Sequence, residues 1–121
     1  MKILVTGDRN WTDVKRIYTV LANIDSAETD TPFLIHGNAR GADRLAADCA
    51  HDLMWSCRAV SANWEKYGRT AGPIRNQEML DMDPDLVIAF HDDLANSKGT
   101  KDMVSRAKKK GVKVILISSK E

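Results

Sequence analysis

The sequence contains no apolar run of about 20 residues, so it predicts no transmembrane helix. Its first residues, MKILVTG, form too short an apolar run for a signal peptide. Cysteine is scarce, and the spacing of Cys49 and Cys57 is not that of metal ligands, so the sequence predicts buried thiols and no metal site. No motif requires a cofactor. These features predict a soluble protein of the reducing cytoplasm that has no membrane partner.

An excess of charge of one sign is also missing. The chain has 18 Lys and Arg residues against 17 Asp and Glu residues, a formal net charge of +1. A broad basic surface for nucleic acid is therefore not expected, and a nucleic-acid partner is not favoured. With 43% hydrophobic residues, a chain of 121 residues is long enough to bury one core. Residues 1–121 are predicted to form a single domain.

Short apolar runs alternate along the chain with helical patterns. The pattern predicts helices after each of the first four strands, the first of them capped by Asn10 or Thr12, and a loop over residues 64–73. The order of elements indicates the α/β class, with a Rossmann-like three-layer sandwich of one five-stranded parallel sheet and helices on both faces. The expected strands cover residues 3–6, 33–36, 57–62, 86–90 and 112–118.

Polar and glycine-containing segments follow each of the first four predicted strands. They read TGDRNW, HGNARGAD, ANWEKYGRTAGPIRN and HDDLANSKGT. Ligands of doubly wound sheets bind beyond the carboxyl ends of the strands, so these segments are expected to meet at one edge and form a site. The candidate ligand-binding residues are Gly7, Asp8, Arg9, His36, Gly37, Gly41, Asp43, Arg69, Gly72, Gly99 and Thr100.

The residue types at this edge suit a phosphate or a sugar. Gly37 and Gly41 bracket a predicted helix start, where free N–H groups and the helix dipole favour an anion. The alternative is a tight turn, in which Asp43 caps the helix rather than holding ribose, and His36 is structural rather than a general acid. A GxGxxG motif and a Walker lysine are both absent, so the pattern alone identifies neither a dinucleotide fold nor a P-loop.

Arginines and acids complete the candidate chemistry. Arg9, Arg69 and Arg75 have the geometry that pairs with phosphate. Arg75 and Glu78 are three residues apart on a predicted helix, so either they pair on the surface or they project together into the crevice. Asp102 falls in the first turn of another predicted helix. A carboxylate such as Asp102 or Glu78 would stabilise the oxocarbenium-like charge that forms when an N-glycosidic bond breaks.

Three long blocks occur in order at the predicted loops: HGNARGADRLA, WEKYGRTAGPIRNQEM and AFHDDLANSKGTKDM. Across nearly its whole length the chain resembles the YspA, cpYpsA-related branch of the SLOG superfamily. The resemblance implies a Rossmann-like fold that binds nucleotides or nucleotide-derived ligands. Relatives in the wider superfamily include DNA-processing proteins and the Lonely Guy phosphoribohydrolases, which split the N-glycosidic bond of nucleoside monophosphates.

Two segments are similar to Lonely Guy motifs. RNQEM, residues 75–79, is similar to R-K-x-x-M, and SKGTKD, residues 97–102, is similar to P-G-G-x-G-T-x-E. The resemblance implies a catalytic or phosphate-binding role for Arg75 and places Asp102 where the enzymes have a catalytic glutamate. It also implies a homodimer. We therefore expect nucleotide binding, with hydrolysis as an added activity, and the alternatives are an inactive nucleotide sensor and a single-stranded DNA-binding module.

Overall fold

The computed structural model describes residues 1–120 and contains one parallel sheet of five strands. The strand order is β3-β2-β1-β4-β5, so β1 lies at the centre and β3 and β5 are the two edges. In chain order the elements are β1 (Lys2–Gly7), α1 (Val14–Ala27), β2 (Phe33–His36), α2 (Ala42–Asp52), β3 (Ser56–Ala59), α3 (Trp64–Tyr67), the 3-10 turn η1 (Gly68–Thr70), α4 (Ala71–Leu80), β4 (Leu86–Phe90), the 3-10 turn η2 (Leu94–Asn96), α5 (Gly99–Lys110) and β5 (Lys113–Ile117).

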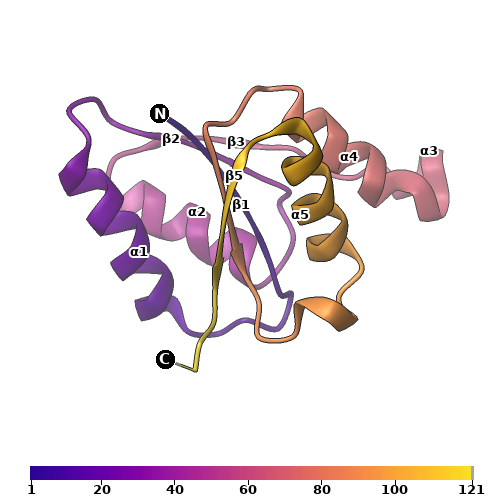
Figure 1. Cartoon of the computed structure of the whole chain (residues 1–121), viewed down its shortest axis with the longest axis horizontal. Helices are drawn as coiled ribbons and strands as arrows, with labels where there is room; N and C mark the ends of the chain where they lie inside the picture. Colours follow the sequence, from indigo (N-terminus) through magenta and orange to yellow (C-terminus); the bar gives the residue numbers. More distant parts are fainter. Residues whose placement is uncertain (121) are drawn as a thin grey trace.

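Helices cover both faces of the sheet. Helices α1 and α2 lie on one side and α4 and α5 on the other, with the sheet seen edge-on between them (Figure 1). Side chains of β1 alternate between the layers: Ile3 and Val5 belong to the core under α1 and α2, and Leu4 belongs to the core under α4 and α5. All three are fully buried. Burial of such side chains stabilises the fold by about 1.5–3 kcal/mol each.

The predicted α/β sandwich of five parallel strands is confirmed. Each predicted strand is present, although β3 ends at Ala59 rather than at residue 62. The inner strands β1 and β4 are apolar runs buried on both faces, as an internal parallel sheet requires. The cap of α1 differs from the prediction of Asn10 or Thr12. It is Asp13, whose Oδ1 accepts a hydrogen bond of 3.1 Å from the backbone N–H of Arg16.

Residues 64–73 are helical, and the loop predicted there is wrong. Asn63 begins α3, since its Oδ1 accepts a hydrogen bond of 3.1 Å from the N–H of Lys66. Pro73 is the third residue of α4, where a missing N–H costs nothing because the first turn has no acceptors within the helix. Glycine and proline break the interior of a helix, but in the first turn of a helix they are tolerated.

The two thiols have different environments. Cys49 is buried on α2, as predicted, but Cys57 is exposed on β3. All four residues of β3 are exposed because it is an edge strand. Burial of Cys57 was therefore a wrong prediction.

The order of the strands reverses between β1 and β4. From β1 the chain builds outward through β2 to β3, and it then returns to the other side of β1 to form β4 and β5. The loops that follow β1 and β4 are neighbours at the lower edge of the sheet in Figure 1. Such a reversal point leaves a crevice that no crossover helix covers. Among residues 1–120, no helix has the length and apolar character needed to cross a membrane.

Candidate functional site

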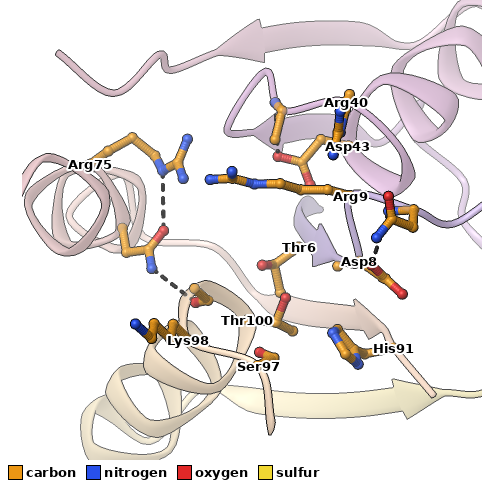
Figure 2. Close-up of a pocket in the computed structure, with 15 residues that line it drawn as sticks. Thr6, Asp8, Arg9, Arg40, Asp43, Arg75, His91, Ser97, Lys98 and Thr100 are labelled. Carbon is orange, nitrogen blue, oxygen red and sulfur yellow. Dashed lines mark hydrogen bonds between the residues drawn. The ribbon is translucent and has the colours of Figure 1, made fainter. Parts of the chain in front are cut away.

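A cavity of about 360 Å³ lies at this reversal point, beyond the carboxyl ends of β1 and β4. Its wall comes from the loops after β1, β2 and β4, from α4, and from the start of α5 (Figure 2). Segments that are far apart in the sequence therefore meet at one edge of the sheet. The lining residues are Thr6, Gly7, Asp8, Arg9, Asn10, Ala39, Arg40, Asp43, Arg75, Asn76, His91, Ser97, Lys98, Gly99 and Thr100.

Positive charge dominates the wall of the cavity. Three guanidinium groups, those of Arg9, Arg40 and Arg75, line it together with the ammonium group of Lys98, against the carboxyl groups of Asp8 and Asp43. In Figure 2 the side chain of Arg9 extends across the cavity toward Arg75. Like charges held this close favour an anion between them.

Arg75 is fixed by hydrogen bonds on two sides of its guanidinium group. Its Nη1 donates to the carbonyl oxygen of Gly37 at 2.6 Å, and its Nε donates to Oδ1 of Asn76 at 3.1 Å. Burial lowers the pKa of Arg75 from its ordinary value, but arginine stays protonated at neutral pH. The charge of Arg75 is thus held at a set position before any ligand arrives.

Asn76 connects Arg75 to helix α5. The side chain is 2% exposed, and its Nδ2 donates to the carbonyl oxygen of Gly99 at 3.2 Å and to Oδ2 of Asp102 at 3.0 Å. Sequence reasoning missed this residue, because a buried asparagine beside an arginine gives no periodic signal. The two helices that carry Arg75 and Thr100 are therefore held in one geometry.

Asp43 folds back onto the loop that precedes α2. Its Oδ2 accepts hydrogen bonds from the N–H groups of Gly37 at 3.0 Å and Ala39 at 3.4 Å. The carboxyl group is 5% exposed, and burial raises its pKa to about 6, against the opposing effect of those bonds and of Arg75. The N–H of Gly37, which was predicted to be free for an anion, is occupied by Asp43. That part of the predicted anion site is wrong.

Gly41 brings the first loop against the start of α2. It has φ of +77°, and a Cβ there would run into the carbonyl oxygens of Asp8 and Arg9. The carbonyl oxygen of Asp8 accepts a hydrogen bond of 3.1 Å from the N–H of Ala42. Only glycine allows both this backbone conformation and this approach.

The start of α5 closes the other side of the cavity. Gly99 and Thr100 are its first two residues, and the N–H groups of a first turn have no acceptor within the helix. Ser97 lies just before them, and its Oγ accepts a hydrogen bond of 3.0 Å from the N–H of Lys101. The helix dipole adds to the positive potential of the arginines.

Seven of the residues predicted from the sequence as ligand-binding or catalytic line this cavity together. They are Gly7, Asp8, Arg9, Asp43, Arg75, Gly99 and Thr100.

The two predicted catalytic acids lie outside the cavity wall. Glu78 lines a separate hollow on the outer side of α4. Asp102 forms an ion pair of 2.9 Å with Arg106 and accepts the hydrogen bond from Asn76, so Asn76 separates it from the cavity. The three-residue spacing of Arg75 and Glu78 does not bring both side chains into the crevice.

Five further predicted residues take supporting or peripheral positions. His36 is 4% exposed, and its Nδ1 accepts a hydrogen bond of 3.0 Å from the N–H of Asn38, while burial lowers its pKa. Gly37 and Gly41 shape the wall from behind, as described above. Gly72 is buried inside α4, and Arg69 is exposed on η1. Neither Gly72 nor Arg69 lines the cavity.

Several lining residues were not singled out from the sequence. Arg40 and Lys98 sit inside motifs that were recognised, but a surface arginine or lysine there carries no periodic signal. Across the described chain, no cluster of three or more His, Cys, Asp or Glu residues has the arrangement of a metal site. The missed residues are Thr6, Asn10, Ala39, Arg40, Asn76, His91, Ser97 and Lys98.

Known proteins share both the sequence pattern and the fold. Residues 1–67 match the family described as YspA, cpYpsA-related SLOG. The chain is also 33% identical over 124 residues to the Gene 61 protein of Mycobacterium phage D29, in an alignment that covers 98% of each. The chain belongs to the YspA, cpYpsA-related SLOG family. The resemblance drawn from its three sequence blocks is thereby confirmed.

This SLOG chain also resembles a solved structure. The X-ray structure of DNA processing protein A (DprA) from Streptococcus pneumoniae matches it with a TM-score of 0.75 at 16% identity, covering 95% of this chain and 49% of that one. At this identity the likeness is one of fold. The SLOG chain spans about half the length of that DNA processing protein.

Proposed function

We propose that the cavity at the reversal point binds a nucleotide or a nucleotide-derived ligand through its phosphate. The observation that carries the proposal is the meeting of Arg9, Arg40 and Arg75 with the first turn of α5 around one cavity. Arginine pairs with phosphate through two parallel N–H donors, and a helix N-terminus adds unpaired N–H groups. Membership of the SLOG family supports a ligand of this class.

Polar groups beside the arginines suit the sugar of such a ligand. Asp8 is half-buried on the cavity wall, where its Oδ1 accepts a hydrogen bond of 2.9 Å from the N–H of Asn10. His91 and Thr6 also line the cavity (Figure 2). Carboxylate, imidazole and hydroxyl groups are the usual partners of ribose hydroxyls, since each can accept or donate a hydrogen bond.

A thermal-shift screen tests the proposal. Nucleoside monophosphates at about 100 times Kd would stabilise the protein by about 2.7 kcal/mol, which raises Tm by several degrees. The matching nucleosides would raise Tm far less, because they lack the phosphate. Arg75→Gln should abolish the nucleotide shift. Arg58→Gln removes the same charge from an exposed position on β3 outside the cavity, and should leave the shift intact.

Hydrolysis of the N-glycosidic bond is the second candidate activity, suggested by the similarity of residues 75–79 and 97–102 to Lonely Guy motifs. Asp8 is a half-buried carboxylate on the cavity wall, whereas Glu78 and Asp102 lie outside that wall. We expect ligand binding without release of free base, measured by chromatography. Base release that Asp102→Asn abolishes while binding persists would instead establish the enzyme. Base release that only Asp8→Asn abolishes would move the catalytic role to Asp8.

Two further parts of the proposal concern partners. The fold shared with a DNA processing protein supports a test of oligonucleotides beside mononucleotides, with competition between them as the readout. The homodimer expected from the sequence stays a prediction, which size-exclusion chromatography with light scattering tests. Failure of every nucleotide and oligonucleotide to raise Tm would contradict the proposed function.

A further inference from the structure

A second hollow, of about 520 Å³, adjoins the cavity on the side of α3. Three arginines, Arg9, Arg40 and Arg75, line both spaces, so they stand at the boundary between them. The two spaces therefore share a cationic boundary. The hollow is lined by Arg9, Gly37, Asn38, Ala39, Arg40, Arg44, Ser61, Ala62, Trp64 and Arg75.

The chemistry of the second hollow differs from that of the first. None of the described residues that line it carries a carboxyl group, and Arg44 adds a fourth guanidinium group. Its lining contains an anchored amide, because Nδ2 of Asn38 donates to Oγ of Ser61 at 3.2 Å. The hollow is therefore lined by cationic and polar groups and by one aromatic wall.

That aromatic wall is Trp64, which is 52% exposed. The other two tryptophans are each 5% exposed, and their indole N–H groups donate to Asp13 and Asp25 within the protein. A Cβ at Gly72 would lie 3.4 Å from Cη2 of Trp64, so the ring lies beside the first turn of α4. The indole nevertheless stays open to solvent. An exposed aromatic ring beside guanidinium groups is typical of a stacking platform for a base.

We propose that the protein binds two nucleoside units joined through phosphate. The linking phosphate lies between Arg9, Arg40 and Arg75, one nucleoside occupies the cavity, and the base of the other stacks on Trp64. The inference rests on the proposed function and extends it, because it assigns the second hollow and the linkage of the ligand. Either a pyrophosphate or a phosphodiester fits the chemistry of three arginines at a boundary.

Tryptophan fluorescence provides a direct test with four probes. These are AMP, diadenosine diphosphate, adenylyl-(3′→5′)-adenosine and a ten-residue deoxyadenylate. Because Trp64 is the exposed indole among the three, a base on it should quench the exposed part of the emission. At least one of the two-unit ligands should quench Trp64 and bind at least tenfold more tightly than AMP.

Two variants separate the second hollow from the first. Trp64→Leu should weaken binding of the two-unit ligand about tenfold, since it removes one stacked base, and leave AMP affinity unchanged. Arg44→Gln, at an exposed residue that lines only the second hollow, should act in the same direction without a change in folding. Arg58→Gln is the matched control and should change neither affinity.

The outcomes distinguish this inference from the proposed function. Equal affinity for AMP and both two-unit ligands, with no effect of Trp64→Leu or Arg44→Gln, would overturn the inference and leave nucleotide binding intact. Absence of binding by all four probes, together with no rise in Tm for any nucleotide in the thermal-shift screen, would overturn both. Tightest binding of the deoxyadenylate, lost in Trp64→Leu, would support the inference and identify a strand as the source of the two units.

Discussion

Asp43 and Arg75 hold the same residue, Gly37, from opposite sides. Asp43 accepts the N–H of Gly37 at 3.0 Å, and Arg75 donates to its carbonyl oxygen at 2.6 Å. Asp43 belongs to α2 and Arg75 to α4, which cover opposite faces of the sheet. The position of the buried arginine in the cavity is therefore coupled to the loop that follows β2.

Gly37→Ala tests this coupling. An added Cβ would lie 2.7 Å from Cζ of Arg75 and 3.0 Å from Oδ2 of Asp43, so the guanidinium group must move. We expect nucleotide affinity to fall at least tenfold and stability to fall by about 1–2 kcal/mol, from the loss of one charge-assisted hydrogen bond. Calorimetric titration and chemical denaturation measure the two effects. Gly99→Ala, where no atom lies near the added Cβ, controls for folding and should not lower stability. Unchanged ligand affinity in Gly37→Ala would show that the position of Arg75 does not matter for binding.

The buried carboxyl group of Asp43 predicts a pH-dependent stability. Its pKa rises from an ordinary 3.8 to about 6 in the folded protein, so the folded state holds the proton more tightly than the unfolded chain. The contribution of Asp43 to the free energy of unfolding is then largest below pH 4. On the order of 3 kcal/mol of it is lost as pH rises to about 6. Asp43→Asn keeps an acceptor for Gly37 and removes the ionisation.

Urea denaturation of both proteins from pH 4 to pH 8 measures the difference. The wild type should lose stability relative to Asp43→Asn as pH rises, mostly between pH 4 and pH 6. His36 acts in the opposite direction, because its lowered pKa makes the folded state lose stability as pH falls. That contribution is common to both proteins and cancels in the difference. Parallel curves at every pH would contradict the raised pKa of Asp43.

Gly41→Ala should be among the most damaging small substitutions in the chain. The residue has φ of +77°, and its added Cβ meets two backbone carbonyl groups that cannot move independently. Gly111→Ala is the matched comparison, since it has φ of +84° with no atom near the added Cβ. We expect a loss of about 1–2 kcal/mol at Gly111 from the backbone conformation alone, and a clearly larger loss at Gly41. Equal melting temperatures for the two variants would contradict the close approach of the first loop to α2.

Asn76→Ala should release Arg75 from its fixed position. The variant removes the acceptor of Arg75 Nε and the donor to Gly99 and Asp102, so it should cost about 2–3 kcal/mol of stability and about tenfold in nucleotide affinity. Gln77→Ala, on the same helix but exposed, should leave affinity unchanged. An affinity loss that is equal in both variants would assign the effect to α4 as a whole.

Sequence patterns were sufficient to predict the sheet and the edge of the sheet at which the cavity lies. A short, fully buried apolar run such as Leu86–Phe90 is typical of an internal strand of a parallel sheet. The loops that follow parallel strands lie at the same edge of the sheet. The loop predicted over residues 64–73 was wrong because glycine and proline occur both in loops and in the first turn of a helix. Capping by Asn63 was the available signal.

Side-chain roles within the site were harder to predict than its location. Asp43 and Asp102 are both acids in a first helical turn, but one occupies the N–H of Gly37 and the other pairs with Arg106. Which partner each acid takes depends on tertiary neighbours that spacing along one helix does not specify. The same limit explains why Asn76 was not anticipated, since two of its three hydrogen bonds depend on the packing of α4 on α5.

The reversal of strand order has a consequence for the dynamics of the whole chain. The sheet divides between β1 and β4 into two halves that are each continuous in sequence, and the cavity wall takes residues from both. A bound molecule would contact both halves and hold them together. Amide hydrogen exchange should then slow in β2 and in β5 together, although neither strand touches the ligand, because opening either half would require the molecule to leave.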